Sequence, residues 1–147
     1  RRSFVVSSFG KTYHATGWKV AYCIAPTELT SEFRKIHQYV TFTTHTPSQW
    51  AIADFMQECP EHYLELSNFY QRKRDWFLKE MSGSRFKMSP SQGSYFQLAD
   101  YSEISDKEDV EFANWLTQEI GVAAIPISVF YHSPPEQKNC SVLFRQR

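Results

Sequence analysis

The chain has no excess of charge and no long apolar run. Its 147 residues carry 16 basic and 16 acidic side chains, which gives a formal net charge of zero. A nucleic acid or a membrane surface is usually met by a basic patch, and no run of like charge stands out here. No apolar stretch approaches the roughly 20 residues that a membrane span needs. We therefore expect no nucleic-acid partner and no membrane partner.

Cysteine is scarce and shows no pattern. The three cysteines lie far apart at Cys23, Cys59 and Cys140, without the spacing of a zinc site. We expect neither a disulfide framework nor a metal site, and a reducing cytoplasm is the default location. The five histidines have no paired carboxylate and no ligand spacing, so we interpret all of them as structural or exposed. They are His14, His37, His45, His62 and His132.

Hydrophobic patterning predicts an α/β fold. The continuous apolar runs at residues 4–7 and 20–25 are typical of strands buried on both faces of a parallel-type sheet. Helices are predicted at residues 27–40, 48–57, 60–81 and 105–119, and further strands at residues 86–88, 93–98 and 122–126. The first helix would begin with Thr27 or Thr30 as its N-cap, and the second with Ser48.

Lys11 is the most informative residue. It directly follows a strand-like run, has small residues around it, and precedes a second cation, Lys19, by eight positions. A lysine amine forms an imine with an aldehyde. The hydroxyl of Ser8 and the charge of Lys19 are groups that proteins use to bind a phosphate dianion. Together these three residues indicate a pyridoxal phosphate site.

Two other interpretations of this segment are possible. A lysine, a hydroxyl and a cation in a turn are by themselves ordinary surface features, and only their shared pattern argues for a site. Gly10-Lys11-Thr12 could also end a nucleotide-binding P-loop. That loop requires a further glycine five residues before Gly10, where this chain has Val5. The P-loop is therefore excluded.

The segment resembles the cofactor-lysine motif of the class I (fold type I) pyridoxal-phosphate aminotransferases, especially the branch with methionine and kynurenine aminotransferases. The family pattern Ser-Phe-Gly-Lys-Thr-(Phe/Tyr) is met by residues 8–13. Thr-Gly-Trp-Lys/Arg and an apolar strand then match residues 16–19 and 20–26. Ala21 is a departure, since the family usually has glycine there. The resemblance extends from Ser3 to about Phe130.

This resemblance implies the C-terminal part of a fold type I transferase, and hence a longer polypeptide. Residues 1–70 would be the end of the large cofactor domain, and residues 71–147 would be the small C-terminal domain. The resemblance also implies a homodimer, in which Phe42 would reach the substrate pocket of the partner subunit.

The implied activity is transfer of an amino group from an amino acid, of methionine or aromatic/kynurenine type, to a 2-oxo acid. Lys11 would hold pyridoxal 5'-phosphate as an imine, and Ser8 and Lys19 would bind its phosphate. Two alternatives stay open. A pyridoxal-phosphate-dependent carbon–sulfur β-lyase on the same fold uses the same lysine, and a truncated chain could be inactive.

The C-terminal residues depart from the family. In members of the family, the segment that corresponds to residues 125–131 is followed by a strand resembling Ile-Val-Arg-Phe-Cys-Phe-Ala-Lys. The arginine of that strand pairs with the substrate carboxylate. Permitted codons for residues 139–147, read one base later, spell that strand.

We hypothesise that a frameshift placed these residues out of frame and removed the arginine from the Ser141/Val142 position. The tail should then pack poorly, and Arg145 should not point toward the cofactor lysine. If the frameshift is absent, Arg145 is the best remaining carboxylate ligand.

Overall fold

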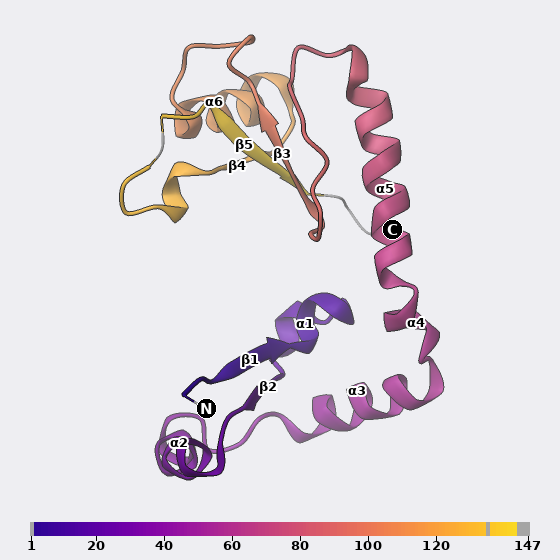
Figure 1. Cartoon of the computed structure of the whole chain (residues 1–147), viewed down its shortest axis with the longest axis vertical. Helices are drawn as coiled ribbons and strands as arrows, with labels where there is room; N and C mark the ends of the chain where they lie inside the picture. Colours follow the sequence, from indigo (N-terminus) through magenta and orange to yellow (C-terminus); the bar gives the residue numbers. More distant parts are fainter. Residues whose placement is uncertain (1, 135, 144–147) are drawn as a thin grey trace. The chain divides into compact units, whose positions relative to one another are not determined.

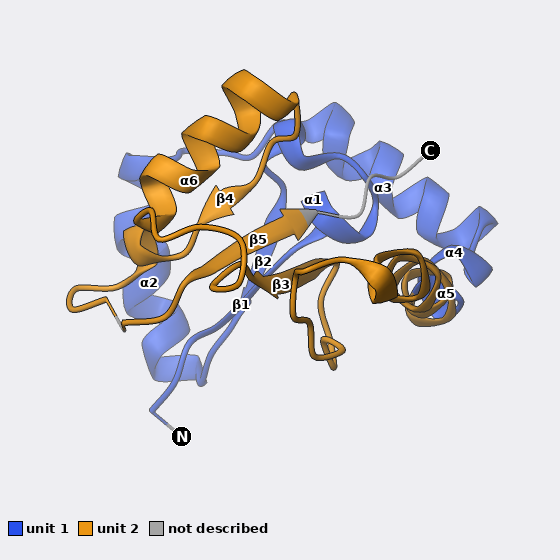
Figure 2. Cartoon of the chain, turned by 90° about the horizontal axis from the view of Figure 1, so that it is seen from above, with its two compact units in different colours: residues 1–66 blue, residues 67–147 orange. Residues whose placement is uncertain are grey.

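The chain divides into two compact units, Arg1–Leu66 and Ser67–Arg147 (Figure 2). The structure, a computed structural model, describes residues 2–134 and 136–143. Each unit is considered by itself below.

The first unit is built around a pair of antiparallel strands, β1 (Val5–Ser8) and β2 (Ala21–Ile24). Their connection contains the short helix α1 (Phe9–Thr12) and the 3-10 turn η1 (Thr16–Trp18). The helices α2 (Thr27–Val40), α3 (Thr46–Glu58) and α4 (Glu61–Leu64) follow. In Figure 1, α1 and α2 lie at opposite ends of the strand pair.

Both strands form where the apolar runs predicted them, but the expected parallel-type sheet with two buried faces is wrong for this chain. The strands pair with each other in antiparallel fashion, with Val5 opposite Ile24. Val6 is 70% exposed and Ile24 is 61% exposed. An apolar run shows that a strand favours burial, but it specifies neither the partner nor the direction. Two strands alone cannot cover both of their faces.

The helix α2 has the predicted bounds, but its start differs. The N-cap position is Pro26 and no side chain caps the helix. The Thr30 hydroxyl instead donates to the Ala25 carbonyl at 3.0 Å. The proposed N-caps Thr27 and Thr30 are therefore both wrong.

The helix α3 begins two residues earlier than Ser48, the N-cap predicted for it. His45 occupies the N-cap position, and Pro47 lies in the first turn, where its missing N–H costs nothing. Ser48 is already helical, and its hydroxyl lies 2.9 Å from Nδ1 of His45.

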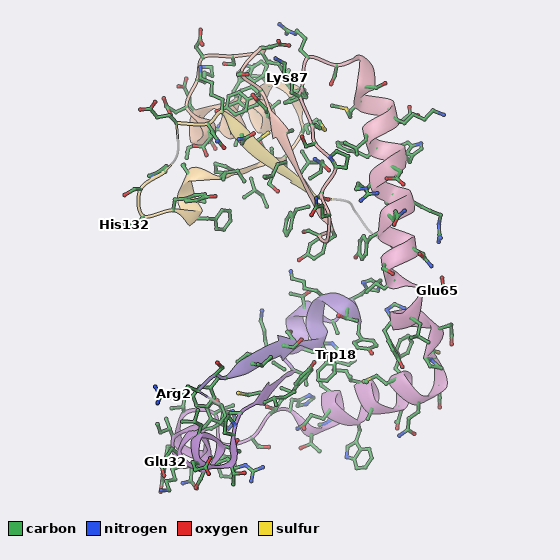
Figure 3. The ribbon with its side chains drawn as sticks, viewed as in Figure 1. Arg2, Trp18, Glu32, Glu65, Lys87 and His132 are labelled. Atoms are coloured by element: carbon green, nitrogen blue, oxygen red, sulfur yellow. The ribbon has the colours of Figure 1, made fainter. Side chains whose placement is uncertain are left out.

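The long helix predicted over residues 60–81 is interrupted. The helix α4 ends at Leu64, and α5 (Leu66–Glu80) begins after Glu65, which is labelled in Figure 3. Glu65 has φ −90° and ψ −3°, which departs from helical geometry. A 3-10 turn, η2 (Met81–Gly83), follows α5.

The second unit contains a three-stranded antiparallel sheet in the order β3 (Phe96–Asp100), β5 (Asn139–Leu143), β4 (Ile125–Pro126). The helix α6 (Asp109–Trp115) covers one face of this sheet and continues into a π-helical turn, η3 (Leu116–Ile120) (Figures 1 and 2). Gly121 ends it with φ 78°, the left-handed conformation that is common for a glycine after a helix. A 3-10 turn, η4 (Ser128–Phe130), follows β4. The core cluster consists of Ala99, Tyr101, Phe112, Leu116 and Cys140.

The helix predicted from residue 105 begins four residues later. The Ser105 hydroxyl accepts a hydrogen bond from the Lys107 amide at 3.2 Å, and Tyr101 donates to the Lys107 carbonyl at 3.1 Å. These bonds hold a turn that competes with the helix. The neighbouring strands are also shifted or shortened relative to residues 93–98 and 122–126.

The prediction that the C-terminal tail packs poorly is wrong for Asn139–Leu143. These residues form the central strand, between β3 and β4. Cys140 is 1% exposed and Ser141 is 6% exposed. The side chain of Cys140 packs into the core cluster of the second unit. Arg145 lies outside the described residues.

Candidate functional site

The connection between β1 and β2 carries the three residues predicted to bind a cofactor. Ser8 ends β1, Lys11 lies in α1, and Lys19 comes two residues before β2. The Phe9 amide donates to the Val20 carbonyl at 3.1 Å, which closes the base of the connection. The structure therefore brings Ser8 and Lys19 to the same end of the strand pair. That one phosphate could touch both remains a prediction.

The Ser8 hydroxyl is the N-cap of α1. It accepts from the Gly10 amide at 3.1 Å and donates to the Val20 carbonyl at a long 3.4 Å. A hydroxyl has one proton and two acceptor lone pairs. Ser8 can therefore turn its proton from the weak carbonyl contact to an anion while it still caps α1.

Gly10 allows the connection to close on itself. Its carbonyl accepts from the Ala15 amide at 2.9 Å and from the Thr16 hydroxyl at 3.2 Å. A Cβ atom at position 10 would lie 3.0 Å from Cα of Thr16 and 3.3 Å from Oγ of Ser8. The sequence reasoning assigned no such role to Gly10 or Thr16.

Two of the predicted site residues have a left-handed backbone. Lys19 has φ 56° and Phe42 has φ 65°, and the one other described non-glycine residue with positive φ is His14, at 56°. This conformation is uncommon outside glycine, and such strain tends to occur at functional sites. Phe42 lies beyond α2 and is 82% exposed. The structure does not bring it into the β1–β2 connection.

The side chain of His62, in α4, contacts the connection between β1 and β2 that carries Lys11. Its Nε2 lies 2.8 Å from the carbonyl oxygen of Thr12, the residue after Lys11. Its ring stacks on Tyr13 at a centroid distance of 5.6 Å. Partial burial, and then the neighbouring Tyr63, raise the pKa of Tyr13 above its ordinary value, which keeps the phenol neutral. Sequence reasoning missed the role of His62, since 50 residues separate it from Thr12.

In the second unit, Asp109 and Ser128 make a polar contact between two elements. Ser128 donates to the Asp109 carboxylate through its amide at 2.6 Å and through its hydroxyl at 2.7 Å. Burial raises the pKa of Asp109, but the hydrogen bonds from Ser128, together with those from the Ile127 and Val110 backbone, outweigh it and leave the pKa below its ordinary value. This contact joins the start of α6 to η4 and has a structural role.

Two further properties concern the described part of the chain. No three or more His, Cys, Asp or Glu residues come together there in a way that could hold a metal ion. Within the same residues, no helix is both long and apolar enough to cross a membrane.

Known sequences that match this chain are aminotransferases. A family model of class I and II aminotransferases matches residues 2–140. The methionine aminotransferase of Escherichia coli (strain K12) is 52% identical over 146 residues, which is 99% of this chain and 38% of that protein. The kynurenine–oxoglutarate transaminase of Dictyostelium discoideum is 34% identical over 148 residues, covering 88% of this chain and 34% of that protein.

Solved structures agree. An Escherichia coli protein with a methionine aminotransferase function matches with a TM-score of 0.91 and 53% identity, over 97% of this chain and 37% of that chain. The N-succinyldiaminopimelate aminotransferase of Mycobacterium tuberculosis matches with a TM-score of 0.85 and 29% identity, over 98% and 38%. The chain thus spans between 34% and 38% of the length of these relatives.

The predicted resemblance and the predicted fold class are both confirmed. The mixed helices and sheets match part of a fold type I aminotransferase over nearly the whole chain. The chain therefore belongs to the family of class I and II aminotransferases.

Proposed function

We propose that this chain is part of a pyridoxal-phosphate-dependent aminotransferase that acts on an amino acid of methionine or aromatic/kynurenine type and a 2-oxo acid. The observation that carries the proposal is the placement of Ser8, Lys11 and Lys19 in one closed connection at the end of β1 and β2. The 52% identity to a methionine aminotransferase supports the substrate class. A cytoplasmic homodimer is part of the same proposal.

The residues present fit one side of the cofactor. Lys11 offers an amine for its aldehyde as an imine, and Ser8 and Lys19 offer a hydroxyl donor and a cation for its phosphate. When bound, pyridoxal phosphate supplies the electron sink for cleavage at the substrate Cα. Nζ of Lys11 is the group that would take and return the Cα proton.

We further propose that residues 1–70 complete the large cofactor domain and that residues 71–147 form the small domain. The boundary between the two compact units at Leu66 supports a division in this region. Phe42 is proposed as a substrate contact of a partner subunit, which its exposed, strained conformation supports.

The test uses the full-length gene product purified with pyridoxal phosphate. We expect a visible absorption band that Lys11→Ala abolishes and that Lys35→Ala leaves intact. Lys35 is a suitable control because it lies in α2 and pairs with Glu32 at the surface. A Lys11→Ala variant that keeps the band would refute the assignment. Amino transfer from methionine or kynurenine, measured against pyruvate release, then separates the aminotransferase from the β-lyase.

A further inference from the structure

His62 makes a hydrogen bond whose direction is determined by its acceptor. The partner is a backbone carbonyl, the oxygen of Thr12, which can only accept. Nε2 of His62 must therefore carry a proton, either in the neutral Nε2–H tautomer or in the imidazolium. Both protonation states preserve this bond.

The His62 ring is also held by aromatic neighbours. Tyr13 stacks on it with an interplanar angle of 27°, and Phe55 meets it edge-on at a centroid distance of 5.3 Å. The ring of His14 approaches edge-on at 5.2 Å. Three separate parts of the first unit, namely the α1 connection, α3 and α4, thus meet at one imidazole.

The bond satisfies a group that a short helix leaves exposed. The last carbonyls of a helix have no partner within the helix. In α1 the Phe9 carbonyl accepts from the Tyr13 amide at 2.9 Å, the Gly10 carbonyl from Ala15, and the Thr12 carbonyl from His62. Lys11 lies directly before Thr12, so a group that fixes the Thr12 peptide also restricts the backbone that carries Lys11.

We propose that His62 is a positioning residue for Lys11. Its Nε2–H holds the C-terminal end of α1, and through that peptide it sets the direction in which the lysine side chain leaves the backbone. The link to catalysis rests on the function proposed above, whereas the hydrogen bond itself does not.

Two substitutions separate the hydrogen bond from the packing. His62→Phe keeps an aromatic ring against Tyr13 and Phe55 but has no donor. His62→Gln loses the ring but places an amide donor at a reach similar to that of Nε2. His132→Phe is the control, because His132 is an exposed histidine of the second unit (Figure 3).

The experiment uses the full-length gene product. In the cofactor-free protein labelled with ¹⁵N-histidine, ring NMR should show His62 protonated at Nε2. In the loaded protein, His62→Phe should lower kcat about tenfold, the scale of one hydrogen bond, with a smaller change in KM, and should move the pH midpoint of the Lys11-dependent absorption. His62→Gln should recover most of both properties, and His132→Phe should behave as the wild type.

Four results would overturn the proposal. They are a neutral His62 protonated at Nδ1, wild-type behaviour of His62→Phe, a His62→Gln variant as impaired as His62→Phe, and an equal loss in His132→Phe. If the wild-type protein has no Lys11-dependent absorption, the proposed function fails instead, and the NMR result still decides whether the bond exists. The NMR result also decides if His62→Phe does not fold.

Discussion

At the scale of single residues, Lys19 combines a charge with an unusual backbone, and substitutions can separate the two. Its φ of 56° costs most side chains about 1–2 kcal/mol relative to ordinary conformations. Asparagine tolerates this conformation, whereas valine does not.

We predict that Lys19→Asn keeps the thermal stability of the protein but weakens binding of pyridoxal phosphate about 10- to 100-fold, because one charge-assisted contact is lost. Lys19→Val should lose both binding and stability. Thermal denaturation and cofactor titration of the two variants check this. Unchanged affinity in Lys19→Asn would remove Lys19 from the phosphate site.

The buried thiol of Cys140 should make the stability of the protein depend on pH in the alkaline range. Burial raises the pKa of its thiol from 9.0 to about 11. In the unfolded chain the thiol ionises first, so the stabilisation is fully present below pH 9.0 and is lost as pH rises toward about 11. Denaturant unfolding between pH 8 and pH 11 should show a falling free energy of unfolding, with a smaller fall in Cys140→Ala. An identical fall in both proteins would mean that a group other than Cys140 causes the loss of stability. Burial is also the largest cause that raises the pKa of Tyr101, to about 12, and both proteins share that burial. The Cys140 charge adds to this rise in the wild type alone.

At the scale of elements, Asp109 joins the start of α6 to η4 through the two hydrogen bonds from Ser128. Because its folded pKa is depressed, its contribution to stability is present above the ordinary value of 3.8 and is lost as pH falls through the folded pKa.

We predict that Asp109→Asn lowers the free energy of unfolding by about 1–3 kcal/mol at pH 7 and flattens its decline in acid, because an amide cannot accept both bonds. Asp106→Asn is the matched control, since Asp106 is fully exposed and pairs only at the surface with Lys138. Urea unfolding at neutral and acidic pH measures both variants. A similar loss in each would mean that charge, and not the contact with Ser128, matters.

The strand β5 bears on the frameshift hypothesis, which stays a prediction although its expected poor packing is wrong. Ser141 lies opposite Leu98 and Ile125 in the neighbouring strands. Because successive side chains of a strand point to opposite faces, Ser141 lies on the face away from α6, and Cys140 lies on the face that α6 covers. Leu98 is 51% exposed on that face but Ser141 itself is 6% exposed, so an arginine in place of Ser141 would have to extend past its neighbours to reach solvent. An arginine in place of Val142 would point toward α6.

Sequencing the coding DNA checks the frameshift. We expect the codons from Asn139 onward to give Arg-Phe-Cys-Phe in the shifted frame. Any other codons would eliminate the idea and leave Arg145 as the candidate carboxylate ligand.

The same elements show what the sequence could predict. The Lys11 segment was predictable because its pattern consists of nearly consecutive residues, and α2 was predictable from its periodicity. The antiparallel pairing of β1 with β2 was not, since strand direction leaves no mark on an apolar run. His62 was missed because its partner lies in another element, and the interruption at Glu65 because glutamate is a good helix former.

At the scale of the whole molecule, apolar side chains remain exposed in the first unit. Such surface is unusual on a complete globular protein and indicates a partner or a further part of the chain. The exposed residues include Val6, Ile24, Tyr39, Val40 and Phe42. The chain covers only 38% of its methionine aminotransferase relative. We therefore expect the rest of a longer polypeptide to cover this surface.

We predict that these 147 residues alone bind pyridoxal phosphate at least tenfold more weakly than the full-length gene product, because Ser8, Lys11 and Lys19, the residues proposed to bind it, address only the phosphate and the aldehyde. Titration of both proteins under one set of conditions measures the difference. Tight, stoichiometric binding by the shorter chain would show that no further segment is needed.

The closeness of Gly10 to Thr16 has a consequence for how this sequence can drift. Every single-base change of a glycine codon that alters the residue adds a side chain, and here its first carbon would press on the backbone of Thr16 and on the Ser8 hydroxyl. At Gly17 the same carbon would meet nothing within 4 Å. Of two glycines seven residues apart, one can gain a side chain only if its neighbours shift by a few tenths of an ångström, whereas the other meets no described atom within 4 Å. Within the connection between β1 and β2, the space around each Cβ position thus limits which glycines can be replaced.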